Sequence, residues 1–242
     1  MEERMVIGIV GGMGSYATVD LFRRLVDAIP ARYEWGRPRI LIDNRCTMPS
    51  RVRAILYGEG REELVAMLAE SARNLLAAGA THLVFACNTS HVFLEELYEQ
   101  LPEARERTVN IIELCARRMS ERGIRSCYLL ATEGTIAVGI YQQVFERLGI
   151  EVLSPSPEEQ VILRDFIEVV KQNKVDDGQR ARLYDYIEGL GQDDVILGCT
   201  ELPVLYGNAG SMLGATRVHD PLSYAIDLLV EEYLQETRSP HA

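Results

Sequence analysis

The sequence predicts an α/β protein of two similar domains, each a roughly four-stranded parallel sheet flanked by helices, with the functional site in the cleft between them. The first observation is that short, β-branched, apolar runs alternate with longer amphipathic stretches along the 242 residues, which is typical of parallel sheets with helical crossovers. The second is a weak internal repeat in the turns that follow the strands. The third is that no Pro/Gly/Ser-rich linker or low-complexity segment interrupts the alternation.

Most of the strand candidates are nearly all apolar, as parallel strands covered by helices on both faces must be. In chain order they are 5–10, 39–43, 82–86, 109–112, 126–131, 150–153, 194–197 and 215–218. The stretches between them have the apolar spacing of amphipathic helices. These helices are expected at 16–29, 61–78, 91–100, 113–122, 136–148, 157–173 and 179–190, with a C-terminal helix at 222–242.

The internal repeat concerns the first and third strands of each half. Each first strand runs into a small-residue turn that carries Gly14 or Gly134, and each third strand runs into a Cys-(x)-Thr turn. Because ligands bind at the carboxyl ends of strands in open α/β sheets, these turns are predicted to face one cleft. We expect a first domain of residues 1–112 together with the helix 222–242, and a second domain of residues 113–221.

The composition excludes several classes of protein and of partner. The chain has 36 acidic and 25 basic residues, a formal net charge of −11, 47% hydrophobic and 25% charged residues, which is typical of a globular protein and not of a disordered, collagen-like or coiled-coil chain. A nucleic-acid partner is not expected, because it needs a basic face. A membrane partner is not expected either, because no apolar run approaches the ~20 residues that cross a bilayer and the first residues do not resemble a signal peptide.

The five cysteines predict a cytoplasmic protein with free thiols, because an odd number without a CxxC pattern is unlike a disulfide framework. They are Cys46, Cys87, Cys115, Cys127 and Cys199. Cys87 and Cys199 each follow an apolar strand, where backbone N–H groups and the positive end of the next helix stabilise a thiolate or a bound carboxylate. One such cysteine is usually a small buried hydrophobe. Two at matching places suit the removal of a proton from one face of a carbon and its delivery to the other.

Two other interpretations of these turns stay open at the level of sequence. Read as Gly12-x-Gly14-x-x-Ala17, the glycine turn fits the dinucleotide fingerprint, with Asp43 as the ribose ligand of an NAD(P)-dependent oxidoreductase. That hypothesis leaves the cysteine turns unexplained, and a tight turn needs glycine whatever it binds. The residues Cys87, His91, Cys199 and His219 could form a metal site. No dense ligand cluster supports it, so we expect neither a metal nor another cofactor.

Local cations gain importance in so acidic a chain, because a dianionic substrate needs them to bind. The segment after the second strand supplies Arg45, Arg51 and Arg53, and Lys171 and Lys174 end a helix of the second half. Arginine can hold a carboxylate through two parallel hydrogen bonds. The usual interpretation of any single one of these residues is a solvated surface charge.

Four blocks of the sequence together resemble the aspartate/glutamate racemase family. They are GIVGGMGSYAT, the segment from Asn44 to Arg51, ACNTSH and ILGCTELP, which occur in this order and cover essentially the whole chain. The pair ACNTSH and GCTEL is the most specific. The resemblance implies two similar α/β domains that face each other, one catalytic cysteine from each, an amino-acid substrate, no pyridoxal or other cofactor, and a homodimer.

The resemblance also assigns roles by motif position. Cys87 and Cys199 become the two acid/base residues, and Arg51 matches the arginine that binds the side-chain carboxylate. Lys171 matches a second-domain lysine with the same task. The remaining substrate-binding positions are Met13 in the glycine turn, Asn88, Thr89 and Thr200 beside the thiols, and Thr132 and Thr135 in the second-domain turn.

The sequence departs from the family pattern at three positions. Ser15 and Ala86 stand where proline is common, and Cys46 is unusual in the arginine loop, which leaves the side-chain specificity open. We predict an enzyme that interconverts L- and D-aspartate by a two-cysteine proton transfer at the α-carbon, with glutamate or a broader set of amino acids as alternative substrates. An isomerase or decarboxylase of another dicarboxylic acid on the same scaffold is a further alternative.

Overall fold

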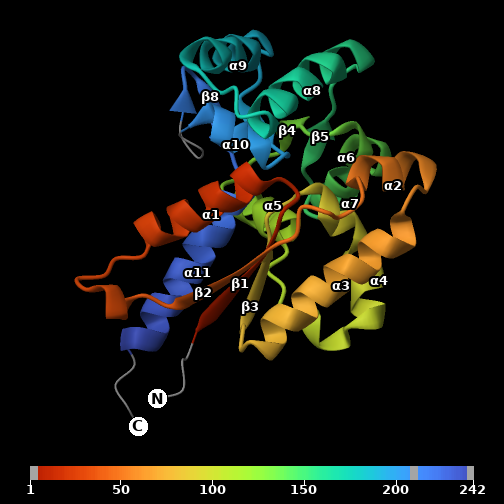
Figure 1. Ribbon diagram of the computed structural model, residues 1–242. Helices are drawn as coiled ribbons and strands as arrows, with labels where there is room; N and C mark the ends of the chain where they lie inside the picture. The colour runs from red at the N-terminus through yellow and green to blue at the C-terminus, as the bar shows by residue number, and fades with distance from the viewer. Residues whose placement is uncertain (1–4, 208–211, 239–242) are drawn as a thin grey trace.

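The computed structural model describes residues 5–207 and 212–238. It contains two separate β-sheets (Figure 1). The first is parallel and has the order β2-β1-β3, formed by β1 (Val6–Gly11), β2 (Arg39–Asn44) and β3 (His82–Phe85). The second has the order β5-β4-β6-β8-β7, formed by β4 (Ser126–Leu130), β5 (Glu151–Leu153), β6 (Asp194–Leu197), β7 (Met212–Leu213) and β8 (Thr216–His219), with only β7 antiparallel. The predicted α/β class with parallel sheets flanked by helices is confirmed.

Helices cover both faces of each sheet. The first sheet lies between α1 (Ser15–Ala28) on one face and α2 (Arg51–Tyr57), α3 (Arg61–Ala77) and α4 (Leu94–Gln100) on the other. The second sheet packs on α8 (Pro157–Lys171), α9 (Asp177–Gly189) and α10 (Glu201–Tyr206). Its other face meets α5 (Ile111–Glu121), α7 (Ile140–Glu146) and α11 (Pro221–Arg238). The short α6 (Glu133–Val138) and the 3-10 turns η1 (Glu34–Gly36), η2 (Thr89–Phe93) and η3 (Pro102–Ala104) complete the elements.

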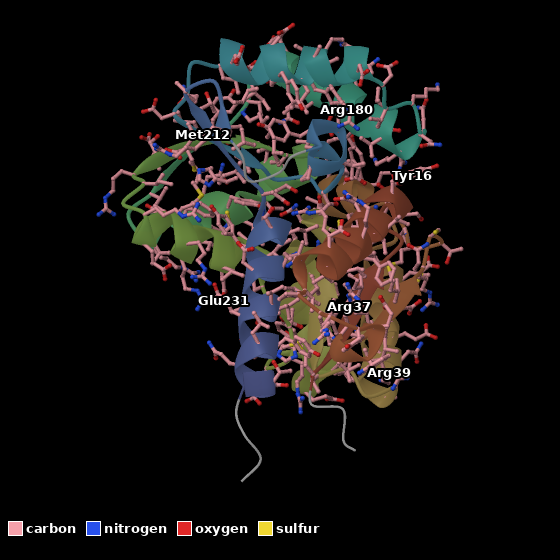
Figure 2. All side chains as sticks on the ribbon, turned by 90° about the vertical axis from the view of Figure 1, so that its left-hand side faces the viewer. Tyr16, Arg37, Arg39, Arg180, Met212 and Glu231 are labelled. Carbon is pink, nitrogen blue, oxygen red and sulfur yellow. The ribbon has the colours of Figure 1, made fainter. Side chains whose placement is uncertain are left out.

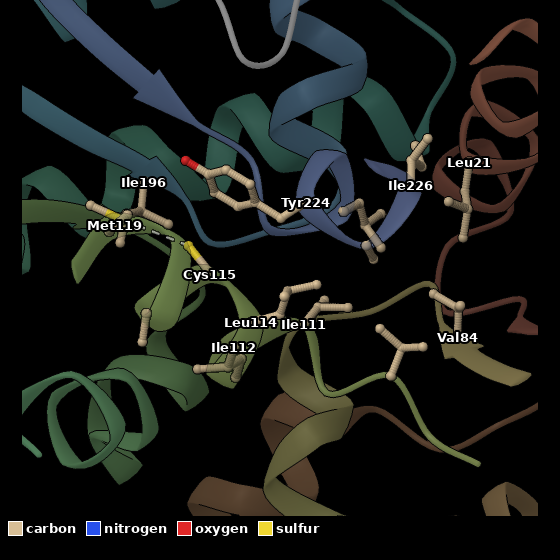
Figure 3. Packing of buried hydrophobic residues seen from close by; sticks show 14 of the residues in the cluster. Leu21, Val84, Ile111, Ile112, Leu114, Cys115, Met119, Ile196, Tyr224 and Ile226 are labelled. Atoms are coloured by element: carbon tan, nitrogen blue, oxygen red, sulfur yellow. Dashed lines mark hydrogen bonds between the residues drawn. The ribbon is translucent and has the colours of Figure 1, made fainter. Parts of the chain in front are cut away.

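A single hydrophobic core lies between the two sheets. It joins Val84 of β3 to Ile196 of β6 through α5 and α11, which contribute residues such as Ile111 and Ile226 (Figure 3). All four of these side chains are at most 4% exposed. Two further cores lie on the outer faces, one under α3 and α4 and one under α8, α9 and α10. The two halves are therefore held together by buried apolar surface as well as by the chain.

The C-terminal helix returns to the first half of the chain. α11 packs against α1 and α5, and both ribbon views show it beside α1 (Figures 1 and 2). The guanidinium of Arg24 on α1 donates to the buried carboxylate of Asp220 at 2.8 Å and to the hydroxyl of Ser223 at 2.6 Å. The hydroxyl of Tyr233 donates to the carbonyl of Gly36 at 2.8 Å. These contacts place the helix beside α1; the helix predicted at 222–242 is present as α11, and residues 239–242 lie outside the described part.

The predicted strand at 109–112 is wrong. Only Thr108 pairs with β3, as an isolated bridge to Leu83, and α5 begins at Ile111. The side chain of Asn110 accepts hydrogen bonds from the backbone N–H groups of Ile112 and Glu113. This is an N-cap, which favours a helix over a strand. The sheets consequently have three and five strands instead of about four each.

Other differences concern boundaries and short elements. The predicted helix 136–148 is two helices, α6 and α7, separated by Gly139, whose φ of 67° lies in the left-handed region. The predicted helix 91–100 starts as the 3-10 turn η2 before α4. The helices α2 and α10, seven and six residues long, are too short to produce a periodic pattern.

Within the described residues, no helix combines the length and the apolar character that crossing a bilayer requires.

Candidate active site

The two cysteines of the repeat come together at the carboxyl ends of the two sheets. Cys87 lies two residues after β3, and Cys199 lies two residues after β6. Both thiols line one small cavity of about 50 Å³. Their residues are 6% and 5% exposed. The parallel strands of each sheet thus deliver one thiol from each half to a shared space.

Seven of the ten site residues predicted from the sequence line this cavity. They are Met13, Arg51, Cys87, Thr89, Thr132, Lys171 and Cys199. Asn88, Thr135 and Thr200 do not line it: Thr135 is bonded to Thr89 and Thr200 to Glu201 of its wall, and Asn88 lies between Cys87 and Thr89 in the chain. A neighbouring cavity of about 230 Å³ shares Lys171 and has Tyr16 in its wall. Tyr16 is the second residue of α1 and lies near the second half of the chain (Figure 2).

The two predicted cations lie on opposite halves. Arg51 begins α2 and donates to the carbonyls of Pro49 at 3.1 Å and Met13 at 2.7 Å. Within the described residues, no carboxylate lies within ion-pair distance of Arg51. Lys171 ends α8 and donates to Glu168 at 2.9 Å. Burial would lower the pKa of Lys171, but the hydrogen bond to Glu168 and the charge of Glu201 outweigh it and raise that pKa. Both side chains therefore offer a positive charge to the cavity.

Hydroxyl groups connect the two halves beside the thiols. The hydroxyl of Thr89 lies 3.1 Å from that of Thr132 and 3.0 Å from that of Thr135. The hydroxyl of Thr200 lies 3.3 Å from the carbonyl of Ala86, again across the two halves. These contacts hold the strand ends of the two halves in fixed positions around the cavity.

Asn88 has an unused donor next to Cys87. Its residue is 1% exposed, and its Oδ1 accepts the hydroxyl of the fully buried Tyr141 at 2.6 Å. Its Nδ2 is buried and has no hydrogen-bond partner among the described residues. A buried amide donor without an acceptor is costly, and a bound carboxylate is the kind of group that would satisfy it.

The structure adds Glu201, which sequence reasoning missed as a site residue. It is 3% exposed and lines both cavities. Its Oε2 accepts the Cys199 thiol at 3.0 Å and lies 3.3 Å from the Thr200 hydroxyl. The motif GCTEL contains it, but an acid in the first turn of a helix is ordinarily a solvated partner of the helix dipole. Ser50, Val52 and Ile167 also line the cavity without having been predicted.

The expectation that both cysteine turns stabilise a thiolate fails at Cys199. Burial, followed by the negative charge of Glu201, raises the pKa of this thiol well above its usual range. The following helix α10 has only six residues. The carboxylate of Glu201, two positions after Cys199, offsets the positive potential of the helix N-terminus at the thiol. Cys199 is therefore a protonated donor in this structure.

The glycine turn and the histidines are explained by contacts within the protein. A Cβ on Gly12 would lie 2.4 Å from the backbone of Arg45, and one on Gly14 would lie 2.9 Å from Glu201 Oε1. The amino end of α1 thus faces a carboxylate, which would repel the pyrophosphate of a dinucleotide. His91 is bonded to the Cys87 carbonyl and to the Ile111 N–H. Residues 5–207 and 212–238 contain no cluster of three or more His, Cys, Asp or Glu able to hold a metal ion.

The other three cysteines lie away from the cavity. All five are free thiols. Cys115 and Cys127 are buried in the central core, and burial raises the pKa of Cys127 to about 12. Cys46 is exposed in the loop before α2, and its sulfur lies 3.1 Å from the Ser15 hydroxyl.

Comparison with known proteins identifies relatives over nearly the whole chain. Residues 10–229 match the family described as Asp/Glu/hydantoin racemase. The broad specificity amino-acid racemase RacX of Bacillus subtilis is 26% identical over 203 residues, which cover 81% of this chain and 86% of that protein. A glutamate racemase of Corynebacterium kroppenstedtii is 34% identical over 171 residues, which cover 65% of this chain and 55% of that protein.

Solved structures of relatives share the fold. The aspartate racemase of Picrophilus torridus superposes with a TM-score of 0.78 at 25% identity, covering 95% of this chain and 94% of that one. An aspartate racemase homologue from Pyrococcus horikoshii OT3 has a TM-score of 0.69 at 26% identity, covering 94% and 98%. Glutamate racemase from Francisella tularensis, solved with D-glutamate, has a TM-score of 0.65 at 17% identity, covering 98% and 83%.

Proposed function

The chain belongs to the Asp/Glu/hydantoin racemase family and is an isomerase, and from this premise we propose that it interconverts L- and D-aspartate without a cofactor. The observation that carries the proposal is the cavity in which Cys87 and Cys199, one from each half, meet Arg51 and Lys171. Two thiols supply the acid and the base, and two cations supply partners for the distal carboxylate of aspartate.

The proposed reaction is a transfer of protons at one carbon. The thiolate of one cysteine takes the α-proton as the C–H bond breaks, and its electron pair stays on the α-carbon. The thiol of the other cysteine then gives its proton to the opposite face, which forms the enantiomer and leaves the second sulfur as thiolate. The next turnover begins from that state or after proton exchange with solvent, so no oxidant or co-reactant is required.

The carbanion must be stabilised for this proton transfer to occur. We assign that task to hydrogen bonds on the α-carboxylate, with the free Nδ2 of Asn88 as a donor and the hydroxyls of Thr89 and Thr200 nearby. Such donors act most strongly where water is excluded, and both cysteines are at most 6% exposed. Arg51, without a carboxylate partner among the described residues, takes the distal carboxylate, and Lys171 shares it.

The size of the cavity requires motion during binding. About 50 Å³ holds only a few water molecules, whereas aspartate has nine non-hydrogen atoms. We propose that residues 1–112 with the C-terminal helix from 222 form one domain and residues 113–221 the other, and that they separate to admit substrate. The neighbouring cavity of about 230 Å³, which shares Lys171, gives the direction of entry.

Glutamate and a broader amino-acid set are the competing substrate proposals. The relatives include glutamate racemases and a broad specificity racemase, and both cations would also bind the longer glutamate side chain. The glycine turn, which faces Glu201, gives no support to the alternative of a dinucleotide-dependent oxidoreductase. We further propose that the protein works in the cytoplasm as a homodimer, which sedimentation analysis would test.

The test of the function is racemisation of single enantiomers by the purified protein. L-aspartate should lose optical activity and gain deuterium at the α-carbon in D₂O, faster than L-glutamate, L-alanine or L-serine. Activity should survive EDTA and hydroxylamine and be lost on thiol alkylation. Loss to EDTA with recovery on adding zinc, or no racemisation of any member of the panel, would overturn the proposal.

A further inference from the structure

Glu201 has a carboxylate oxygen that no contact in the structure uses. Its Oε2 accepts the Cys199 thiol and lies near the Thr200 hydroxyl. Its Oε1 is buried and has no hydrogen-bond partner within the described residues. Leaving a buried acceptor unpaired is unfavourable, and here the unpaired oxygen belongs to a residue that lines both cavities.

The charges around the small cavity complement those of an acidic amino acid. The charged side chains of the described residues that line it are Arg51, Lys171 and Glu201. These are two cations and one anion, whereas aspartate carries two carboxylates and one ammonium group. With both cations on the distal carboxylate and neutral donors on the α-carboxylate, Glu201 is the charged lining group left to face the ammonium.

We propose that Glu201 Oε1 accepts a hydrogen bond from the α-ammonium of the substrate and so selects α-amino acids over dicarboxylic acids that lack the amino group. The inference rests on the proposed function only in placing the α-carbon between the thiols. Because the same carboxylate holds the Cys199 thiol, recognition of the amino group and orientation of the acid are coupled. The residue therefore sets the substrate class and positions Cys199.

The surroundings of Oε1 explain why it is free. A Cβ on Gly14 would lie 2.9 Å from Oε1. The φ of Gly14 is −116°, which any residue can adopt, so the glycine is required by space and not by backbone conformation. The glycine therefore keeps space beside the carboxylate, and the amino end of the 14-residue α1 favours a negative charge there. Lys171, the cation that could compete for Oε1, donates to Glu168 at 2.9 Å and is 40% exposed.

The test compares two ligands that differ by the amino group. Binding of L-aspartate and of succinate is measured by calorimetry in a Cys87→Ser background, where aspartate is not turned over. Glu201→Gln keeps the size of the side chain and removes its charge. The substitution should weaken the binding of aspartate by roughly 10- to 100-fold, the range of a charge-assisted hydrogen bond. Succinate should bind with unchanged or higher affinity, because a repulsion between carboxylates is lost. The preference for aspartate over succinate should thus fall at least about tenfold.

Two further variants separate recognition from general damage. Glu168→Gln removes the other acid beside Lys171, at a position that lines neither cavity. It should change the affinity for both ligands by the same factor. Gly14→Ala fills the space beside Oε1 and should reduce the preference for aspartate while the charge stays. Should Glu201→Gln alter both ligands in parallel, or Gly14→Ala leave the preference intact, the inference is wrong.

The outcome is independent of the racemisation assay. If the wild type racemises no amino acid but Glu201→Gln still abolishes the preference for aspartate, the proposed function fails and the ammonium site stands. If the wild type racemises aspartate and the preference survives Glu201→Gln, the ammonium site fails and the racemase stands.

Discussion

Cys87 and Cys199 are not equivalent residues. Cys199 donates to Glu201 at 3.0 Å, and burial with that negative charge raises its pKa. No hydrogen bond reaches the Cys87 thiol from the described residues. We therefore expect Cys199 to carry a proton at rest and to be the acid for the enantiomer that binds this form, with Cys87 as the base in that direction.

Serine at either cysteine should abolish racemisation, because a hydroxyl of similar shape is far too weak a base. We expect Cys87→Ser and Cys199→Ser to reduce turnover by at least ~10²- to 10⁴-fold, the usual worth of a general acid or base. Since the two enantiomers have equal energy, kcat/KM must fall equally in both directions. The asymmetry should emerge in elimination from β-chloroalanine, which needs only the base: each variant should act on one hand. Exposed Cys46→Ser is the control, with near-normal activity; near-normal turnover in either of the other two contradicts the mechanism.

Arg51 should determine affinity for the distal carboxylate. Arg51→Leu removes a bidentate, charge-assisted contact, which corresponds to roughly 10- to 100-fold in the KM for aspartate. Alanine lacks that carboxylate, so the KM for alanine should rise much less. Steady-state kinetics with both amino acids provide the measurement, and Arg53→Leu, whose guanidinium pairs with Glu59 outside the cavity, is the control. An equal loss for both substrates would mean that Arg51 only holds the Met13 turn.

Two glycines of one turn should respond differently to alanine. Gly12 has a φ of 84°, and its Cβ would meet the backbone of Arg45 at 2.4 Å, so Gly12→Ala should cost more than about 1–2 kcal/mol of unfolding free energy. Gly14→Ala meets only a side-chain carboxylate and should change stability less but raise the KM for aspartate more. Thermal unfolding and kinetics on the same preparations distinguish the two. Equal destabilisation with equal KM values would contradict these assignments.

His91 should make the junction between η2 and α5 sensitive to acid. Its ring bonds the Cys87 carbonyl at 3.0 Å and accepts from Ile111 N–H at 3.4 Å. Burial, only partly offset by its backbone hydrogen bonds, lowers its pKa to about 4 from 6.5. The unfolded chain therefore binds the proton first, and stability present above pH 6.5 is lost as the pH falls towards 4.

The loss attributable to this histidine between pH 7 and pH 5 is about 2 kcal/mol. Urea unfolding of the wild type and of His91→Asn at both pH values measures it. The variant should be less stable at pH 7 but should lose about 2 kcal/mol less on acidification. The same loss in both proteins would assign the acid sensitivity elsewhere.

The molecule as a whole should unfold as one unit although it has two sheets. Ile226 of α11 lies in the core that joins β3 to β6, whereas Leu183 of α9 lies in the outer core of the second sheet only. Ile226→Ala and Leu183→Ala should each cost roughly 2–5 kcal/mol. Hydrogen exchange should then show protection falling together in β1 and β6 for Ile226→Ala, but mainly in β6 for Leu183→Ala. Loss confined to one sheet in Ile226→Ala would mean that the halves are energetically independent.

The sequence by itself determined the fold class, the order of the long elements and most of the cavity. Runs such as 5–10 and 194–197 are apolar on both faces, so their burial in a parallel sheet could be read locally. The Cys-(x)-Thr repeat placed Cys87 and Cys199 at strand ends for the same reason, and the structure brings them into one cavity.

Only the tertiary structure decided the fate of residues 109–112 and the importance of Glu201. The first depended on the non-local pairing with β3, which is limited to a bridge between Leu83 and Thr108 and so leaves Asn110 to cap α5. The second depended on Gly14, 187 positions away in the sequence, lying against the Glu201 carboxylate. The local hydrophobic pattern indicates which faces of an element are apolar. Whether a single charged side chain is buried, and which groups it bonds, depends on non-local contacts. These contacts form only when both halves of the chain have folded against each other.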